Sequence, residues 1–177
     1  MSLDVGGPSF PPCPPPPAPG DPAPPLKLPW ELGEDPFDLD RARPRGPVVV
    51  LFFPLAFSPT CTDELCQVRD GISDWGSLGE EGDGSVTVVA VSVDSIFVNA
   101  RFARELGVEF PLLSDFNREG CTAWGVREDD YFGQKGVAKR AAFVVGQDGR
   151  VAWAWVTEDD SVLPDLGEVK RALQELA

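Results

Sequence analysis

The stretch that decides the fold is Val48-Val49-Val50-Leu51-Phe52-Phe53, which runs directly into Pro54-Leu55-Ala56-Phe57-Ser58-Pro59-Thr60-Cys61. An apolar run of this length and β-branched content is typical of a buried strand. A helix is predicted next, because apolar residues recur at spacings of three and four: Leu65, Val68, Ile72 and Trp75. Thr60 and Asp63 have the form of a capping box, so we expect this helix to begin at about Cys61.

Cys61 is thereby expected in the first turn of a helix, at the carboxyl end of a buried strand. Unpaired backbone N–H groups and the positive end of the helix dipole lie at that point. This placement lowers the pKa of a thiol from about 8.5 towards roughly 3.5 to 7.5. Asp63 and Glu64 oppose the effect, so we expect a further positive charge nearby. Cys61 is the candidate nucleophile.

The rest of the chain alternates strand and helix signals. Asp94 or Ser95 can cap a helix that ends at Gly107, and Asp165 with Glu168 can form the capping box of the last helix. The expected elements are a strand over 86–93, a helix from about 95 to 106, an extended piece over 110–113, a short helix over 115–124, a polar loop over 127–139, strands over 141–145 and 150–156 around a turn at 147–149, and a last helix from about 166 to 176. Together they predict a thioredoxin-like α/β fold with a central mixed sheet flanked by helices.

The amino-terminal part of the chain is rich in proline. Residues 1–19 favour extended polyproline II, and we expect them to be a disordered leader. Residues 20–47 keep much proline and charge, and we expect short edge strands and loops that cover the sheet. Residues 20–177 are thus predicted to form one domain.

Composition excludes several classes of function. The net charge is −14 over 177 residues, which argues against a nucleic-acid or anionic-membrane surface. No segment approaches the roughly 20 apolar residues of a membrane span, and no secretory signal is visible, so we expect a cytoplasmic protein. The chain has no histidine, which removes His-based triads and most zinc and haem sites. No cofactor is expected.

The motif around Cys61 resembles the active site of the peroxiredoxins, whose pattern is Pro-x-x-x-Ser-x-x-Cys. Cys61-Thr-Asp-Glu-Leu-Cys66 is similar to the bacterioferritin-comigratory (Q-type) form, which has a second cysteine five residues after the first. Phe-Phe-Pro-Leu-Ala-Phe and Leu-Leu-Ser-Asp-Phe also resemble the E-type alkyl hydroperoxidases. The resemblance extends from about Gly20 to the carboxyl terminus and brings with it the peroxiredoxin form of the thioredoxin-like fold, with an amino-terminal extension.

The resemblance implies a thiol peroxidase and assigns roles to individual residues. Cys61 is the peroxidatic residue, oxidised to a sulfenic acid by hydrogen peroxide or an organic hydroperoxide. Arg140, in a phrase similar to Arg-x-x-Phe-Val, is the missing positive charge, and the Ser58 hydroxyl is a second donor. Pro54, which has no N–H, walls the sulfur off from water. Glu64 fits the Q-type pattern and can orient this network, although an acid in the first turn of a helix has a structural role as well.

The fate of the sulfenic acid leaves alternatives open. Cys66 is the implied resolving residue, with a thioredoxin- or glutaredoxin-type protein as reductant. Cys121 is expected in the core, and no role is given to Cys13. A one-Cys peroxiredoxin resolved by an external thiol, a thioredoxin-like oxidoreductase and a non-catalytic binding module remain alternatives. The oxidoreductase usually carries Cys-x-x-Cys, whereas four residues separate Cys61 from Cys66. The protein is expected to be a monomer or a homodimer.

Overall fold

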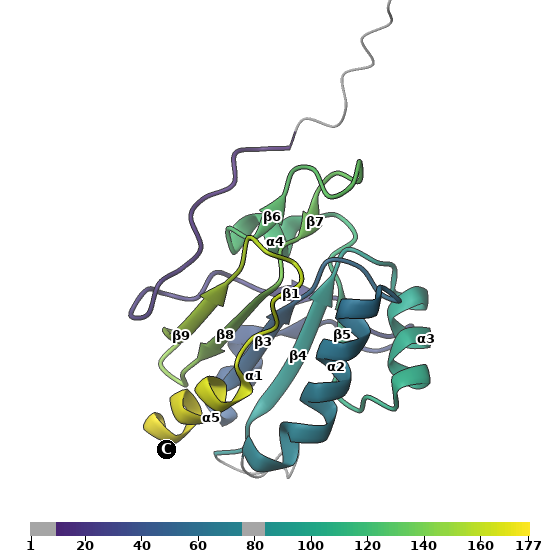
Figure 1. The fold of residues 1–177 in the computed structure, drawn as a ribbon. Coiled ribbons are helices and arrows are strands. Elements are labelled where there is room, and N and C mark those ends of the chain that lie inside the picture. Colours follow the sequence, from purple (N-terminus) through teal and green to yellow (C-terminus); the bar gives the residue numbers. More distant parts are fainter. Residues whose placement is uncertain (1–9, 76–83) are drawn as a thin grey trace, which may run out of the picture.

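A five-stranded mixed sheet forms the centre of the molecule (Figure 1). The computed structural model describes residues 10–75 and 84–177. The strand order is β5-β4-β3-β8-β9, with β3, β4 and β5 parallel and β8 and β9 antiparallel to their neighbours. The strands are β3 (Val48–Phe52), β4 (Thr87–Ser92), β5 (Leu112–Ser114), β8 (Ala141–Val145) and β9 (Val151–Val156). The predicted central mixed sheet is confirmed.

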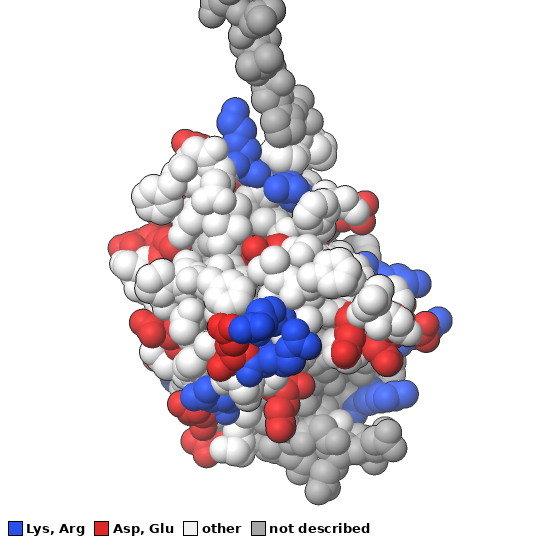
Figure 2. Space-filling view, turned by 90° about the vertical axis from the view of Figure 1, so that its right-hand side faces the viewer, with Lys and Arg blue, Asp and Glu red and all other residues white. Residues whose placement is uncertain are grey.

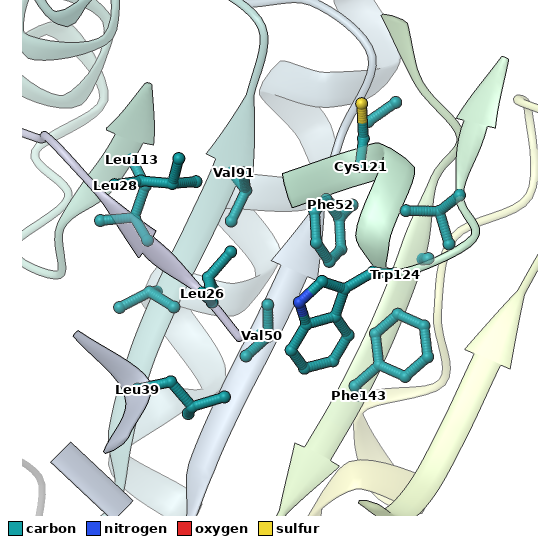
Figure 3. Packing of buried hydrophobic residues seen from close by; sticks show 14 of the residues in the cluster. Leu26, Leu28, Leu39, Val50, Phe52, Val91, Leu113, Cys121, Trp124 and Phe143 are labelled. Atoms are coloured by element: carbon teal, nitrogen blue, oxygen red, sulfur yellow. The ribbon is translucent and has the colours of Figure 1, made fainter. Parts of the chain in front are cut away.

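Alternate residues of β3 face two separate apolar layers, as the period of a strand requires. On one side, β3 packs against three helices: α2 (Pro59–Gly71), α3 (Ile96–Leu106) and α5 (Leu166–Glu175). On the other side, short elements cover the sheet: β1 (Lys27–Leu28), β2 (Phe37–Asp38), α1 (Leu39–Ala42), α4 (Glu119–Ala123), β6 (Arg127–Glu128) and β7 (Val137–Ala138). Trp124 fills this second layer, with its ring centroid 5.7 Å from that of Phe52 and 5.0 Å from that of Phe143 (Figure 3).

Several predicted boundaries are confirmed by their caps. Ser95 caps α3 and Gly107 ends it in the left-handed conformation, at φ 65°. Asp165 caps α5 by accepting from the backbone N–H groups of Gly167 and Glu168. Two short 3₁₀ helices complete the secondary structure, η1 (Arg43–Arg45) and η2 (Ile72–Trp75).

Two predicted segments that follow β5 are wrong. The segment over 127–139 is not a plain loop, because β6 and β7 pair as an antiparallel hairpin within it. Strands of two residues show no period in the sequence, so a polar stretch hides them. The predicted helix over 115–124 is shorter, since Asp115 stays outside α4 and accepts from the N–H groups of Gly120 and Cys121.

The second half of the leader lies against the domain. Residues 1–9 of the predicted disordered leader fall outside the described residues, but residues 10–19 differ from that expectation. The Arg127 guanidinium lies 4.8 Å from the centroid of the Phe10 ring, and the Cys13 thiol donates to the Thr122 carbonyl at 3.7 Å. The Gly20 N–H donates to the Val151 carbonyl at 2.8 Å, which joins the end of the leader to β9.

The face of the molecule over α3 carries charges of both signs (Figure 2). Arg101 and Glu105 pair along this helix at 2.6 Å. Within residues 10–75 and 84–177, no helix has the length and apolar character needed to cross a bilayer.

Candidate active site

The amino terminus of α2 places Cys61 beside the carboxyl end of β3. Ser58 is the cap of α2, and its hydroxyl accepts a hydrogen bond from the Cys61 N–H at 3.4 Å. The prediction that Thr60 and Asp63 form the capping box is therefore wrong, and α2 begins two residues earlier than expected. Pro59 explains the shift, because its fixed φ suits the first helical position and its missing N–H costs nothing there.

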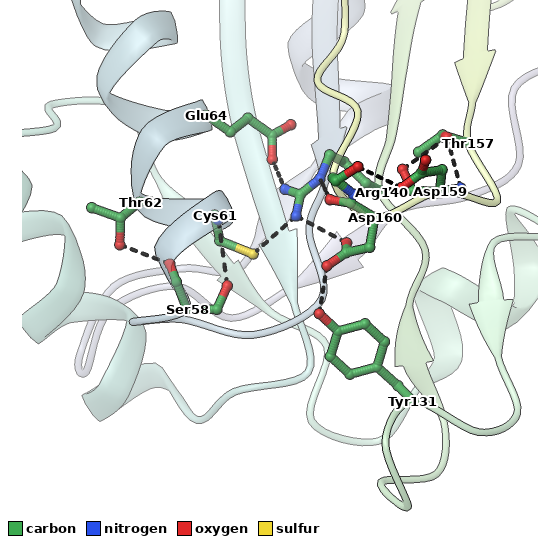
Figure 4. Close-up of polar contacts among 10 residues, drawn as sticks. Ser58, Cys61, Thr62, Glu64, Tyr131, Arg140, Thr157, Asp159 and Asp160 are labelled. Atoms are coloured by element: carbon green, nitrogen blue, oxygen red, sulfur yellow. Dashed lines mark hydrogen bonds and ion pairs between the residues drawn. The ribbon is translucent and has the colours of Figure 1, made fainter.

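Arg140 lies next to the sulfur atom of Cys61. Ala141 pairs with Phe52 in the β3–β8 ladder, so Arg140 lies at the same edge of the sheet as the loop that follows β3. The Arg140 side chain is fully buried, and its Nη2 lies 3.5 Å from the Cys61 Sγ (Figure 4). The structure thus brings together the predicted nucleophile and the predicted compensating charge, from positions 79 residues apart.

Two carboxylates hold the guanidinium in place. Arg140 Nη1 donates to Glu64 Oε2, and Nη2 donates to Asp160 Oδ1 at 2.9 Å (Figure 4). Arg140 Nε also donates to the Asp160 carbonyl oxygen at 3.3 Å. Asp160 was not predicted from the sequence to be a site residue, because it lies in the loop after β9 and only the tertiary fold brings it to Arg140. Its second oxygen accepts from the Tyr131 hydroxyl at 2.5 Å, which ties the β6–β7 hairpin into the network.

The environment of Cys61 pulls its pKa in two directions. Burial raises the pKa of the thiol, and this is the dominant effect. The Arg140 guanidinium, the Ser58 hydroxyl and the backbone of Leu55 lower it, but they do not outweigh burial. The helix terminus was expected to lower the pKa, with Asp63 and Glu64 opposing it and a further positive charge nearby. Burial is the larger opposing effect, and the Arg140 guanidinium is the largest influence that offsets it.

Glu64 is buried and its pKa is raised to about 7, because burial disfavours the carboxylate more strongly than Arg140 favours it. Its Oε1 is buried with no hydrogen-bond partner among the described residues. Burial alone would lower the pKa of Arg140, but Glu64 and Cys61 raise it, so the guanidinium stays charged. One permanent cation therefore faces three acidic groups: Cys61, Glu64 and Asp160.

A cavity of about 600 Å³ opens above the guanidinium. Pro54, Thr60 and Arg140 form part of its wall, and the rest comes from the β6–β7 hairpin and the loop after β9. Neither the Cys61 thiol nor the Arg140 side chain has exposed surface, so both lie beneath the surface of the cavity wall. Asp94, at the carboxyl end of β4, fixes the loop after Pro54 by accepting from the Ala56 N–H at 2.8 Å.

All four cysteines are free thiols. Cys66 lies on α2 and is half-buried, and no bond joins it to Cys61. Cys121 is fully buried in the layer that contains Trp124, as predicted. Burial and the nearby Asp115 carboxylate raise the pKa of Cys121, which is the opposite of what a reactive thiol needs.

Comparison with solved structures agrees with this architecture. The crystal structure of peroxidoxin BcpB from Mycobacterium tuberculosis is similar with a TM-score of 0.75 and 27% identity, over 91% of this chain and 99% of that one. The predicted thioredoxin-like peroxiredoxin fold is confirmed by this likeness.

Relatives and a family profile agree as well. Alkyl hydroperoxide reductase E of Mycobacterium tuberculosis is 36% identical over 117 residues, which are 65% of this chain and 70% of that protein. A second protein of the same organism, assigned to the peroxiredoxins, is 39% identical over 110 residues; the match is 60% of this chain and 66% of that protein, slightly under two thirds of its length. The profile of the AhpC/TSA family matches residues 19–154. Since this match spans most of the sequence, the chain belongs to the AhpC/TSA family and is a peroxiredoxin of the bacterioferritin-comigratory or E-type kind.

Proposed function

We propose that this protein is a thiol peroxidase that reduces hydrogen peroxide and organic hydroperoxides at Cys61. The observation that carries the proposal is the position of the Cys61 Sγ, at the amino terminus of α2 and 3.5 Å from the Arg140 Nη2. A thiolate placed there has a cation beside it and backbone N–H groups behind it. The same guanidinium can donate hydrogen bonds to the peroxide oxygens.

The chemical step follows from this arrangement. The Cys61 thiolate attacks one peroxide oxygen, the O–O bond breaks, and its electron pair leaves on the other oxygen. That oxygen takes up a proton and departs as water or an alcohol, and Cys61 becomes a sulfenic acid. Arg140, the Ser58 hydroxyl and the Cys61 N–H are the donors near the developing charge. Pro54 contributes a wall that offers no competing N–H.

Cys66 is the proposed resolving residue. Its thiolate attacks the sulfur of the sulfenic acid, a disulfide forms, and the hydroxyl group leaves as water after taking up a proton. A thioredoxin- or glutaredoxin-type dithiol then reduces the disulfide. Resolution by an external thiol is the second candidate, since Cys61 and Cys66 are both free thiols in the part of the chain that the structure describes. A cytoplasmic location belongs to the proposal, because four free thiols suit a reducing compartment.

Peroxide consumption tests the proposal directly. The reduced protein should consume hydrogen peroxide with a dithiol reductant, and Cys61→Ser should abolish this because it removes the thiol that lies 3.5 Å from the Arg140 guanidinium. Cys13→Ser and Cys121→Ser are the matched controls and should keep the rate. Retention of a tenth of the rate by Cys61→Ser would place the nucleophile elsewhere. Disulfide reduction without peroxide turnover would instead favour a thioredoxin-like oxidoreductase.

Resolution needs its own measurement. Cys66→Ser should keep a fast first turnover, lose recycling, and accumulate a Cys61 sulfenic acid that a dimedone-type reagent labels. Full recycling by Cys66→Ser with a protein reductant would transfer the resolving role to an external thiol.

A further inference from the structure

The cavity above Arg140 is much larger than hydrogen peroxide requires. Its volume of about 600 Å³ lies within the range of sites that take drug-sized organic ligands. Three segments shape it beyond the catalytic residues: the β6–β7 hairpin, the residues that lead into β8, and the loop over 157–161. The room available points to a peroxide that carries an organic body.

The lining of the cavity has an excess of negative charge. Its acidic residues are Glu128, Asp130, Glu158, Asp159 and Asp160, and its basic residues are Lys139 and Arg140. Both cations are already paired. Glu158 binds the Lys139 ammonium with both oxygens, at 2.7 and 2.9 Å, and Arg140 is bonded to Glu64 and Asp160.

The acids of the lining that have no cationic partner among the described residues, Glu128, Asp130 and Asp159, therefore make the electrostatic potential at the mouth of the cavity negative. Within the described ranges, no Lys or Arg side chain forms an ion pair with Glu128, Asp130 or Asp159. The neighbouring Asp129 pairs with Arg127, Glu158 with Lys139, and Asp160 with Arg140. The face over α3, by contrast, mixes the two signs (Figure 2). A negatively charged ligand that approaches Cys61 must pass the acidic mouth, and charged clefts of this kind change association rates by factors of ten or more.

The tip of the β6–β7 hairpin adds an apolar surface to this mouth. Phe132 is 89% exposed and adopts φ 51°, in the left-handed region that non-glycine residues rarely occupy. Its ring packs edge to face on Tyr131, with centroids 4.9 Å apart. The Tyr131 hydroxyl is fixed by Asp160, so the pair of rings is held beside the cavity. Exposure of a large apolar side chain on such a backbone suggests contact with an apolar ligand.

We propose that this cavity selects peroxides by charge: it takes neutral organic hydroperoxides with an apolar body and disfavours those that carry a carboxylate. Tyr131 and Phe132 contact the apolar body, and the unpaired acids of the mouth repel the anion. This inference rests on the proposed peroxidase function and deepens it by naming the substrate class.

Three matched peroxides test the proposal: cumene hydroperoxide, its para-carboxylate analogue, and the methyl ester of that analogue. The second-order rate constant for Cys61 oxidation is measured for each, with hydrogen peroxide as reference. The ester should react about tenfold faster than the carboxylate at low ionic strength, and the ratio should shrink as salt screens the mouth. Equal rates, a faster carboxylate, or a ratio that does not respond to salt would overturn the proposal.

Variants locate the effect. In the double variant Glu128→Gln, Asp130→Asn, the ratio of the rate constants for the ester and the carboxylate should fall at least threefold. The control is the double variant Glu105→Gln, Glu168→Gln, which removes the same amount of charge far from the mouth. It should leave the ratio and all rate constants unchanged. Phe132→Gly, which also suits the positive φ, should slow cumene hydroperoxide relative to hydrogen peroxide by severalfold. An unchanged ratio in the first variant contradicts charge selection, and an unchanged relative rate in the last contradicts the aromatic contact.

The two levels of proposal fail differently. If hydrogen peroxide also leaves Cys61 unoxidised, the peroxidase function itself is wrong. If hydrogen peroxide oxidises Cys61 normally and the ester and carboxylate react alike, only the charge selection is wrong.

Discussion

Arg140 is the residue on which we expect the proposed reactivity of Cys61 to depend. Burial raises the pKa of the thiol, and the guanidinium is the largest of the influences that lower it. Arg140→Ala should therefore raise the Cys61 pKa further and slow peroxide reduction by at least tenfold at neutral pH. Alkylation of Cys61 by iodoacetamide as a function of pH measures the shift.

A control is needed because Arg140→Ala also leaves the buried Glu64 without its partner, and an unpaired buried charge destabilises a fold. The double variant Arg140→Ala, Glu64→Gln removes that charge and should show a raised Cys61 pKa in a stable protein. An alkylation midpoint equal to that of the Glu64→Gln single variant would show that Arg140 is not the compensating charge.

The raised pKa of Glu64 leads to a second prediction, about how the free energy of unfolding depends on pH. Its pKa is about 7 in the folded protein and about 4.3 in an unfolded chain. The folded-state pKa is raised, so the stabilising contribution of Glu64 is fully present below about pH 4.3 and is lost as pH rises through about 7. Gln imitates the protonated form, so Glu64→Gln should increase the free energy of unfolding by about 1 kcal/mol at pH 5 and about 3.5 kcal/mol at pH 8.

Urea denaturation of the reduced protein at these two pH values tests this stability effect. Glu168→Gln is the matched control, since Glu168 is a partly exposed acid on α5 that pairs with Arg171, and its effect should not grow with pH. A constant difference between Glu64→Gln and the parent protein across the range would mean that Glu64 is ionised throughout.

At the scale of elements, α2 has to change if Cys61 and Cys66 are to pair. Residues five apart on an intact helix have Cα atoms roughly 8.7 Å apart, whereas a disulfide needs about 4.4 to 6.8 Å. Leu65 and Val68 are fully buried and hold the middle of α2 in the core, while its first turn lies at the end of the element. Helix ends open more readily than their centres, so we expect oxidation to unwind the first one or two turns.

Amide hydrogen exchange can detect this opening. In peroxide-treated protein, exchange should accelerate over about residues 61–69, with α3 and α5 as unchanged internal references. Cys66→Ser treated in the same way should keep the protection of the reduced state. A mapped Cys61–Cys66 disulfide with undiminished protection over 61–69 would exclude the unwinding.

Elements with a local sequence signal were predictable, and the contacts between elements were only partly so. The centre of the sheet was predictable from the apolar runs of β3 and β4 and from the turn over 147–149, because these patterns are local in the sequence. Arg140 was predicted only through the resemblance. Asp160 carries no signal of its own, since its role exists only once the loop after β9 meets β8. The start of α2 was misplaced because Ser58 and Pro59 supply a better cap than Thr60.

At the scale of the whole molecule, the leader and the domain are expected to fold together from Phe10 onward. Pro17 is buried, and Arg118 as well as Arg127 faces the Phe10 ring. Gly125 shows how close the approach is. It adopts φ 69°, and a Cβ built there would lie 2.5 Å from the Pro14 carbonyl oxygen. Any side chain at position 125 must therefore displace the leader as well as strain its own backbone.

A double-mutant cycle separates these two effects. Gly125→Ala in a protein that lacks residues 1–16 should cost about 1 kcal/mol, from backbone strain alone. The same substitution in the full chain should cost a further 1–2 kcal/mol or so, because it also breaks the contacts of the leader, including cation–π pairs of about 0.5–2 kcal/mol. Urea denaturation of the four proteins gives the coupling. If the two costs are equal within about 0.3 kcal/mol, the leader does not stabilise the domain, and its contacts with α4 and the β6–β7 hairpin contribute nothing to folding.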